Sequence, residues 1–343
     1  MTMKRILFIV LLFAGMTVKA QDFETSGAYM SFISQQQDNI TKKYLSYNSA
    51  VSHGKKARKV EKLRTKLLDE VQEARMNISG MGKFKGDGEY KDSAVNFMKF
   101  YYSVLNDDYA KIVNMEDIAE QSYDEMEAYI NLQEAIDKKL DEANNRISDA
   151  QKTFAGKYNI HLVDSKDAIS EMAKKVGEVN KDYHHIYLIF FKPYIQEDNL
   201  LEAISKGNVN GIEQDKNALA KYAQEAIDKL AALPAYPGDG SVRSAAKQLF
   251  QFYIKEANEK MKTVSDYFLV KERFETIQKE YEKKSDHSKA DVDAYNKGVN
   301  DINTASNAYN ANNQNLNEQR KDLLKNWNDA VEDFFRDETP KYK

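Results

Sequence analysis

Residues 67–81 read LLDEVQEARMNISGM, and residues 219–233 read LAKYAQEAIDKLAAL. In both stretches apolar side chains recur at alternating intervals of four and three residues, the pattern of a packing seam in an antiparallel helical bundle. The two seams lie 152 residues apart, which indicates an internal duplication. The seam residues are Leu67, Val71, Ala74, Ile78 and Met81 in the first stretch, and Leu219, Ala223, Ala226, Leu230 and Leu233 in the second.

The sequence around both seams repeats with nearly the same offset. FKGDG at 84–88 pairs with YPGDG at 236–240, and AVSHG at 50–54 pairs with AISKG at 203–207. We therefore expect the two Gly-Asp-Gly loops at equivalent corners, and Phe100 and Phe252 buried at matching sites. A calcium loop needs several oxygen ligands at set spacing. Because each loop offers one aspartate between its glycines, the sequence favours a chain reversal closed by an Asx-turn.

Helix breakers are scarce, with 14 Gly and 4 Pro in 343 residues. The sequence predicts an all-α fold made of two tandem repeats of an antiparallel four-helix unit with long helices. The first unit covers 21–163 and the second 164–343, and a kink is expected at Pro193. The expected helices span 24–52, 55–80, 91–113, 115–157, 165–206, 209–233, 241–284 and 288–336.

Residues 1–20 have the pattern of a signal peptide. Lys4 and Arg5 precede an apolar run at 6–16, and Val18-Lys19-Ala20 fits a small-x-small cleavage site. We expect cleavage after Ala20 and a periplasmic, cell-surface or secreted protein; the alternative is an uncleaved anchor. The chain has no cysteine, which excludes disulfides and a lipobox. The strongest later apolar run, 186–191, is too short to span a bilayer.

The charge balance argues against a nucleic-acid partner. Cleavage would leave 47 basic residues against 54 acidic ones, and the charges are interleaved. No phosphate-binding loop or dinucleotide motif occurs. We assign no catalytic, cofactor-binding or metal-ligating residue.

The five histidines include the adjacent pair His184 and His185. A di-iron bundle needs Glu-x-x-His on two helices, and this motif is absent from the sequence. An interior or boundary position of His184 is therefore favoured. The alternative is a metal-binding or enzymatic helical bundle with a site near His184, which requires acids from several helices to converge there.

The last expected helix carries a stripe of side-chain amides. The stripe is offset by one residue, about 100° around a helix, from the seam that begins at Val292 and Tyr295. Three interpretations are open: a buried amide ladder that fixes register, an exposed surface for a partner or glycan, and a plain polar rim. The stripe consists of Asn296, Asn300, Asn303, Asn307, Asn310, Gln314 and Asn317.

Aromatic side chains are concentrated around one helix, at Tyr183, Tyr187, Phe190, Phe191 and Tyr194. A helix that is apolar all round is usually buried on several faces. We expect 183–204 to be buried and to join the two units. The alternative is an exposed aromatic surface for a partner or ligand.

YH at 183–184, YLIFFK at 187–192 and LLEAI at 200–204 resemble the central signature of an uncharacterised family of bacterial surface proteins found in spirochaetes and Bacteroidetes. SYDEM at 122–126, the Gly-Asp loops and the Asn-rich final helix are similar to it as well. Many members look like lipoproteins, whereas this chain lacks the cysteine. The resemblance implies no activity, ligand or catalytic residue.

The sequence thus favours an exported, non-catalytic helical surface or periplasmic protein that binds or scaffolds. No cofactor is expected, and the candidate partners are an envelope protein or a glycan. The enzymatic or metal-binding bundle is the alternative, followed by a membrane-active bundle, which would need a longer apolar hairpin.

Overall fold

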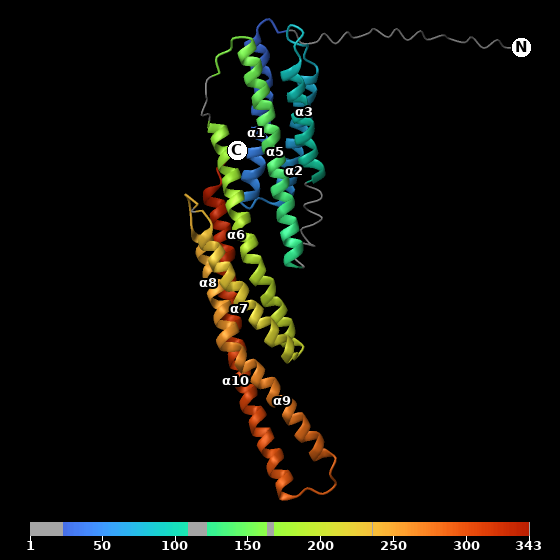
Figure 1. Cartoon of the computed structure of the whole chain (residues 1–343), viewed down its shortest axis with the longest axis vertical. Coiled ribbons are helices and arrows are strands. Elements are labelled where there is room, and N and C mark those ends of the chain that lie inside the picture. Colours follow the sequence, from blue (N-terminus) through green and yellow to red (C-terminus); the bar gives the residue numbers. More distant parts are fainter. Residues whose placement is uncertain (1–22, 109–121, 163–167, 235, 343) are drawn as a thin grey trace, which may run out of the picture.

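The computed structural model describes residues 23–108, 122–162, 168–234 and 236–342 (Figure 1). These residues form helices and no β-strand, so the fold is all-α, as predicted. No helix within the described ranges is both long and apolar enough to cross a membrane. The expected signal peptide, 1–20, and the expected boundary between 163 and 164 lie outside the described residues.

The observed helices follow the expected ones, except that the helix expected at 115–157 begins at Tyr123, because Ser122 is extended and caps it. The expected helix ends at 113 and 115 lie outside the described residues. The expected helix 241–284 contains a five-residue π-helical segment, and a matching π segment follows α3. The α6 helix continues through Pro193. The elements are α1 (Ser26–Ser52), α2 (Ala57–Ser79), α3 (Glu89–Ser103), η1 (Val104–Asp108), α5 (Tyr123–Lys157), α6 (Ala168–Ser205), α7 (Val209–Ala232), α8 (Ser241–Lys255), η2 (Glu256–Lys260), α9 (Met261–Glu282) and α10 (Lys289–Glu338).

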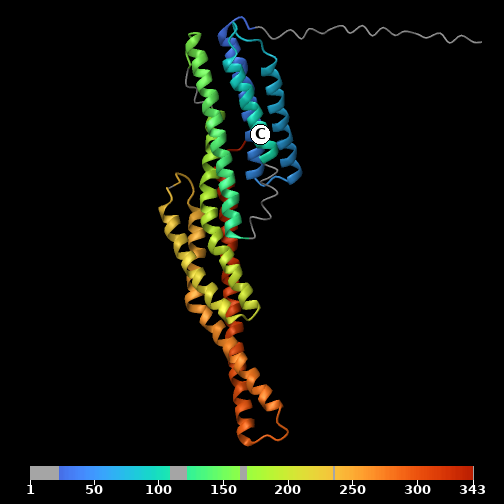
Figure 2. The ribbon, with the colours of Figure 1, turned by 45° about the vertical axis from the view of Figure 1, so that its right-hand side comes forward.

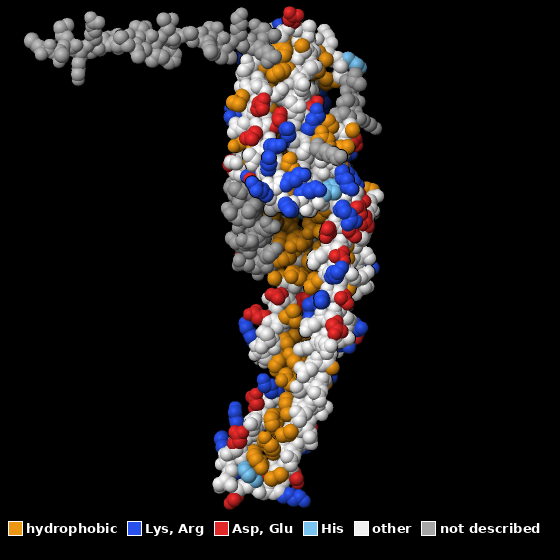
Figure 3. Space-filling model, turned by 180° about the vertical axis from the view of Figure 1, so that it is seen from behind, with side chains coloured by type: hydrophobic (Ala, Val, Ile, Leu, Met, Phe, Trp, Pro, Cys, Tyr) orange, Lys and Arg blue, Asp and Glu red, His pale blue; other side chains and the backbone are white. Residues whose placement is uncertain are grey.

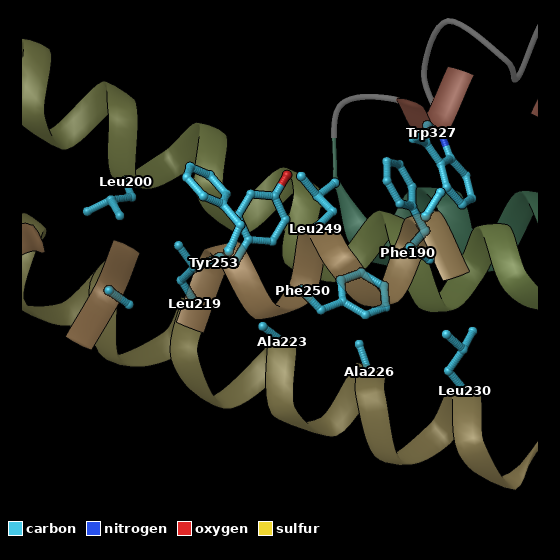
Figure 4. Packing of buried hydrophobic residues seen from close by; sticks show 14 of the residues in the cluster. Phe190, Leu200, Leu219, Ala223, Ala226, Leu230, Leu249, Phe250, Tyr253 and Trp327 are labelled. Carbon is cyan, nitrogen blue, oxygen red and sulfur yellow. The ribbon is translucent and has the colours of Figure 1, made fainter. Parts of the chain in front are cut away.

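The buried apolar side chains form three clusters. One is built from α1, α2, α3 and α5, and a larger one from α6, α7, α8 and α10 with the start of α9. A small third cluster joins α5 to α6. All five seam residues of 67–81 are buried; in the second seam Leu233 is half-buried and the other four are buried along one edge of α7 (Figure 4).

Several local structures recur at the sequence offset. Both α3 and α8 have 15 residues, and each runs into a five-residue π segment. The helices α1 and α6 end at Gly54 and Gly207, whose φ angles are +60° and +62°. In each case the glycine amide donates a hydrogen bond to the carbonyl three residues earlier, and the next amide donates to the carbonyl five residues before it. This pattern is a Schellman cap.

Phe100 and Phe252 were expected to be buried at matching sites, and this expectation is wrong for Phe100. Phe252 is 6% exposed, whereas Phe100 is half-buried. The guanidinium of Arg320 on α10 covers the Phe252 ring at 5.9 Å from the ring centroid. Phe100 lies outside the first cluster, which uses Phe97 and Tyr101 on its edge.

The molecule is elongated, and a two-helix hairpin projects from one end (Figures 1 and 2). We call the hairpin of α9 and the first half of α10, residues 261–312, the arm, and the remaining helices the body. The α10 helix has 50 residues and is therefore about 75 Å long. Its second half packs against α8 in the body, so α10 runs continuously from the tip of the arm into the core.

Candidate functional site

The Gly-Asp-Gly loops are helix-starting corners. Asp87 Oδ1 accepts a hydrogen bond from the Glu89 amide at 3.1 Å, and Asp239 Oδ1 accepts one from the Ser241 amide at 2.8 Å. These bonds form the expected Asx-turns at equivalent places before α3 and α8.

We call α1 to α5 the first half of the chain and α6 to α10 the second half. In each half, a residue at the end of the last helix binds the Gly-Asp-Gly loop. Lys157, at the end of α5, donates to Asp87 at 2.7 Å and lowers the pKa of that carboxyl. Glu338, at the end of α10, accepts from the Asp239 amide at 3.0 Å and from Lys175 of α6 at 2.6 Å. Both aspartates therefore have a structural use.

His184 and His185 do not gather a metal-ligand set. His184 is half-buried, and burial together with the neighbouring His185 lowers its pKa, while Glu134 of α5 acts in the opposite direction. His185 Nε2 lies 3.5 Å from Glu134 Oε1. Within the described ranges no three side chains of His, Asp or Glu are grouped so that they could hold a metal ion.

An open pocket of about 290 Å³ lies beside His185, between the start of α5 and the helices α6 and α7. Lys192 is central to it: its Nζ lies 4.1 Å from the centroid of the Tyr222 ring, 5.2 Å from that of Tyr123, and 3.5 Å from Glu225 Oε2. Charge pairing and cation–π contacts therefore already satisfy this lysine. The pocket lies where the start of α5 meets α6 and α7, and its lining combines these charged groups with apolar side chains.

In the aromatic segment of α6, Phe190 and Phe191 are buried, as predicted, whereas Tyr183 and Tyr187 are half-buried and Tyr194 is exposed. The segment contacts both halves. Phe190 is 4% exposed and stacks on Trp327 of α10, with ring centroids 4.0 Å apart and planes 2° apart (Figure 4). Phe191 is 2% exposed and packs against Met126 and Ile130 of α5. The alternative of an exposed aromatic surface is wrong for these two residues.

The first five members of the amide stripe of α10 lie on the surface of the arm, and Gln314 and Asn317 follow on the adjoining part of α10. Among the described residues, α9 is the helix that packs against this part of α10 (Figure 1), and the seam one residue away faces that contact. The buried-ladder interpretation is therefore wrong. Every member of the stripe is exposed: Asn296, Asn300, Asn303, Asn307, Asn310, Gln314 and Asn317.

Beside the stripe, the seam of the arm is only half-covered, because two helices cannot enclose it. Phe274, Tyr281 and Tyr295 are half-buried, and the rings of Phe274 and Tyr281 each contact that of Tyr295. Val292 is 37% exposed. Figure 3 shows a strip of hydrophobic side chains down one face of the arm, next to an uncharged strip. The arm thus combines carboxamides and partly exposed aromatic rings.

Sequence reasoning missed one cluster, formed by Glu197, Glu256 and Arg320 in the core of the second half. Glu256 lies 64 positions and Glu197 123 positions before Arg320, so no short sequence motif indicated the cluster. The expected duplication offered a signal, because Glu256 aligns with the buried Val104 at the 152-residue offset.

Comparisons of the chain with protein-family models, with curated proteins and with solved structures gave no match.

Proposed function

We propose that this chain is an exported, non-catalytic helical protein of the cell surface or periplasm, which uses its arm to bind a polar, uncharged envelope component. We further propose that its body consists of two tandem four-helix units. The supporting features of the architecture are the separate core clusters, the recurring glycine caps and the paired Asx-turn corners.

The observation that carries the binding proposal is the exposed amide stripe of the arm. A carboxamide offers both a hydrogen-bond acceptor and two donors without net charge. No hydrogen bond within the described part of the chain engages the side-chain amides of Asn296, Asn300, Asn303, Asn307 or Asn310. Asparagine is a modest helix former, so helix stability does not explain why it recurs five times along one face of the helix.

A glycan fits this surface best. Hydroxyl and acetamido groups of sugars pair with carboxamides, and the apolar faces of sugar rings pack on aromatic side chains. Tyr295 and Tyr309 supply half-buried rings beside the stripe, and Tyr309 stacks on Tyr267 of α9 with centroids 4.4 Å apart. The position of the stripe on a projecting hairpin gives an extended polymer access to it (Figure 1).

The test is co-sedimentation of the mature protein with insoluble envelope polysaccharide from the native host. The variant replaces Asn300, Asn303 and Asn307 by Ala, which preserves the helix because Ala is the better helix former. The control replaces Asn144 and Asn145, exposed residues of α5 in the body, by Ala.

We expect the arm variant to lose most of the sedimented protein and the control to match the wild type. Equal sedimentation of all three proteins, or none, contradicts glycan binding by the arm. In parallel, photo-crosslinkers are placed at the same arm positions in intact cells to detect a protein partner. A protein adduct that forms only from arm positions would indicate that the partner is an envelope protein and not a glycan.

A further inference from the structure

Three charged side chains meet in the core of the second half, at the place where the arm joins the body. Arg320 of α10 binds Glu197 of α6 through Nε and Glu256 of η2 through Nη2, the latter at 2.6 Å. Its Nη1 donates to Asn317 Oδ1, also at 2.6 Å. Glu197, Glu256 and Arg320 are 3%, 1% and 9% exposed, so water does not solvate these charges.

The cluster has two carboxylates for one guanidinium. The charged groups of α7, which packs against η2, have other partners: Glu213 pairs with Lys216 at 2.7 Å, and Asp215 accepts from Gln196 at 3.0 Å. The described part of α9 that begins after η2 contributes Met261, Val264 and Ser265 to the core. A second cation therefore does not face the pair within the described residues.

An unbalanced buried carboxylate is costly, and the group binds a proton to remove the charge. Burial and the charge of Glu197 raise the pKa of Glu256 to about 8, although Arg320 opposes the shift. Glu256 Oε2 and the Tyr253 hydroxyl of α8 are buried without a hydrogen-bond partner in the described structure. A buried oxygen that receives no hydrogen bond is a poor place for negative charge and a good one for a proton.

The first half provides an internal comparison. At the 152-residue offset, the first half has Val104 in place of Glu256 and Tyr101 in place of Tyr253. At an offset of 153 residues, it has Tyr44 in place of Glu197. Both halves nevertheless form the π segment. The ionic cluster is therefore not needed to make this helical segment, and it occurs in the half that carries the arm.

We propose that Glu256 binds a proton beside Glu197 at neutral pH, and that this proton stabilises the joint between arm and body. On release, the carboxyl O–H bond breaks, the electron pair stays on the oxygen, and water takes the proton. Two carboxylates then face one guanidinium, and their repulsion weakens the packing of α6 and η2 against α10.

The direction of the pH effect follows from linkage. The native chain holds a proton that the unfolded chain releases above the ordinary glutamate pKa of 4.5. Stability from this site is therefore fully present below pH 4.5, decreases as pH rises, and levels off above about pH 8. A single proton changes the unfolding constant about tenfold per pH unit within that window.

The first measurement is infrared spectroscopy of the full mature chain at pH 6, where exposed carboxyl groups are ionised. We expect a carbonyl band of a protonated, buried carboxyl that disappears between pH 7 and 9 and is absent in Glu256→Gln. The control is Glu275→Gln, an exposed glutamate of α9, which should retain the band. Absence of the band in the wild type overturns the proposal, whether or not the variants fold.

The second measurement is denaturant unfolding followed by the fluorescence of Trp327, the single tryptophan, which lies in the same core. Gln at position 256 stays neutral at all pH values. The unfolding constant of the wild type relative to Glu256→Gln should rise about tenfold from pH 6 to 7 and by less from pH 7 to 8, while the Glu275→Gln ratio stays constant. A wild-type ratio that is constant within about twofold refutes the link between the proton and stability. If Glu256→Gln does not fold, Glu197→Gln is measured in its place.

Discussion

Replacement of Phe191 by Ala tests whether α6 holds the two halves together, and replacement of Phe190 by Ala tests how α6 packs against α10 within the second half. Both side chains are nearly fully buried, at 4% and 2% exposure, so each truncation removes a buried ring and leaves a cavity. Such a change costs about 3 to 5 kcal/mol. Phe190 also loses its stack on Trp327, and an aromatic pair contributes a further ~0.5 to 1.5 kcal/mol. We therefore expect the larger loss at Phe190.

The assay is urea unfolding followed in parallel by circular dichroism, which reports all helices, and by Trp327 fluorescence, which reports the second half. Phe190→Ala should shift the Trp327 transition to lower urea. Phe191→Ala should separate the two transitions, because it weakens the α5–α6 contact with Met126 and Ile130. The matched control is Met76→Ala at a 62% exposed site of α2, where a change within ~0.5 kcal/mol is expected. If neither alanine variant changes the free energy of unfolding appreciably, the proposal that α6 joins the two halves is refuted.

Further predictions concern processing, caps, loops and metals. Intact-mass measurement of protein from the native host should show cleavage after Ala20; retention of residues 1–20 contradicts export by this segment. Gly54→Ala should cost about 1 to 2 kcal/mol in urea unfolding because of its positive φ, and Gly207→Ala should cost more, since the added Cβ would lie 3.1 Å from Phe268 Cε1; equal or negligible losses contradict the cap geometry. The lowered pKa of Asp87 gives stability that is present above its ordinary value of 3.8 and is lost as pH falls through the lower folded value, so Asp87→Asn should flatten the acid side of the stability curve, and an unchanged curve refutes this. Elemental analysis should find less than one zinc, iron or manganese per chain, and one tightly held metal would favour the enzymatic alternative.

Helix positions were predictable because capping residues, glycines and prolines fall at the ends of the apolar seams. The helix expected at 209–233 is observed at 209–232, since Asn208 caps its start and Pro234 cannot continue it. The seam of 67–81 is buried throughout because α1 and α3 pack against α2 within the same cluster.

Exposure in the last helix was not predictable from its own sequence. Val292 and Leu316 belong to the same apolar register, yet Val292 is 37% exposed and Leu316 is 3% exposed. The difference depends on what packs outside α10, since one helix covers the arm and several cover the body. For the same reason the burial of Glu197 and Arg320 became visible only when α6, η2 and α10 were placed together.

The central claim is that two units of the same design follow one another along the chain. Its most direct test is to produce residues 21–163 and 164–343 separately and to measure circular dichroism during urea unfolding of each. The account predicts that both halves are strongly helical and unfold in a single cooperative transition, because each has its own buried cluster. A half that is unfolded by itself, or that melts without cooperativity while the whole chain folds, would contradict it.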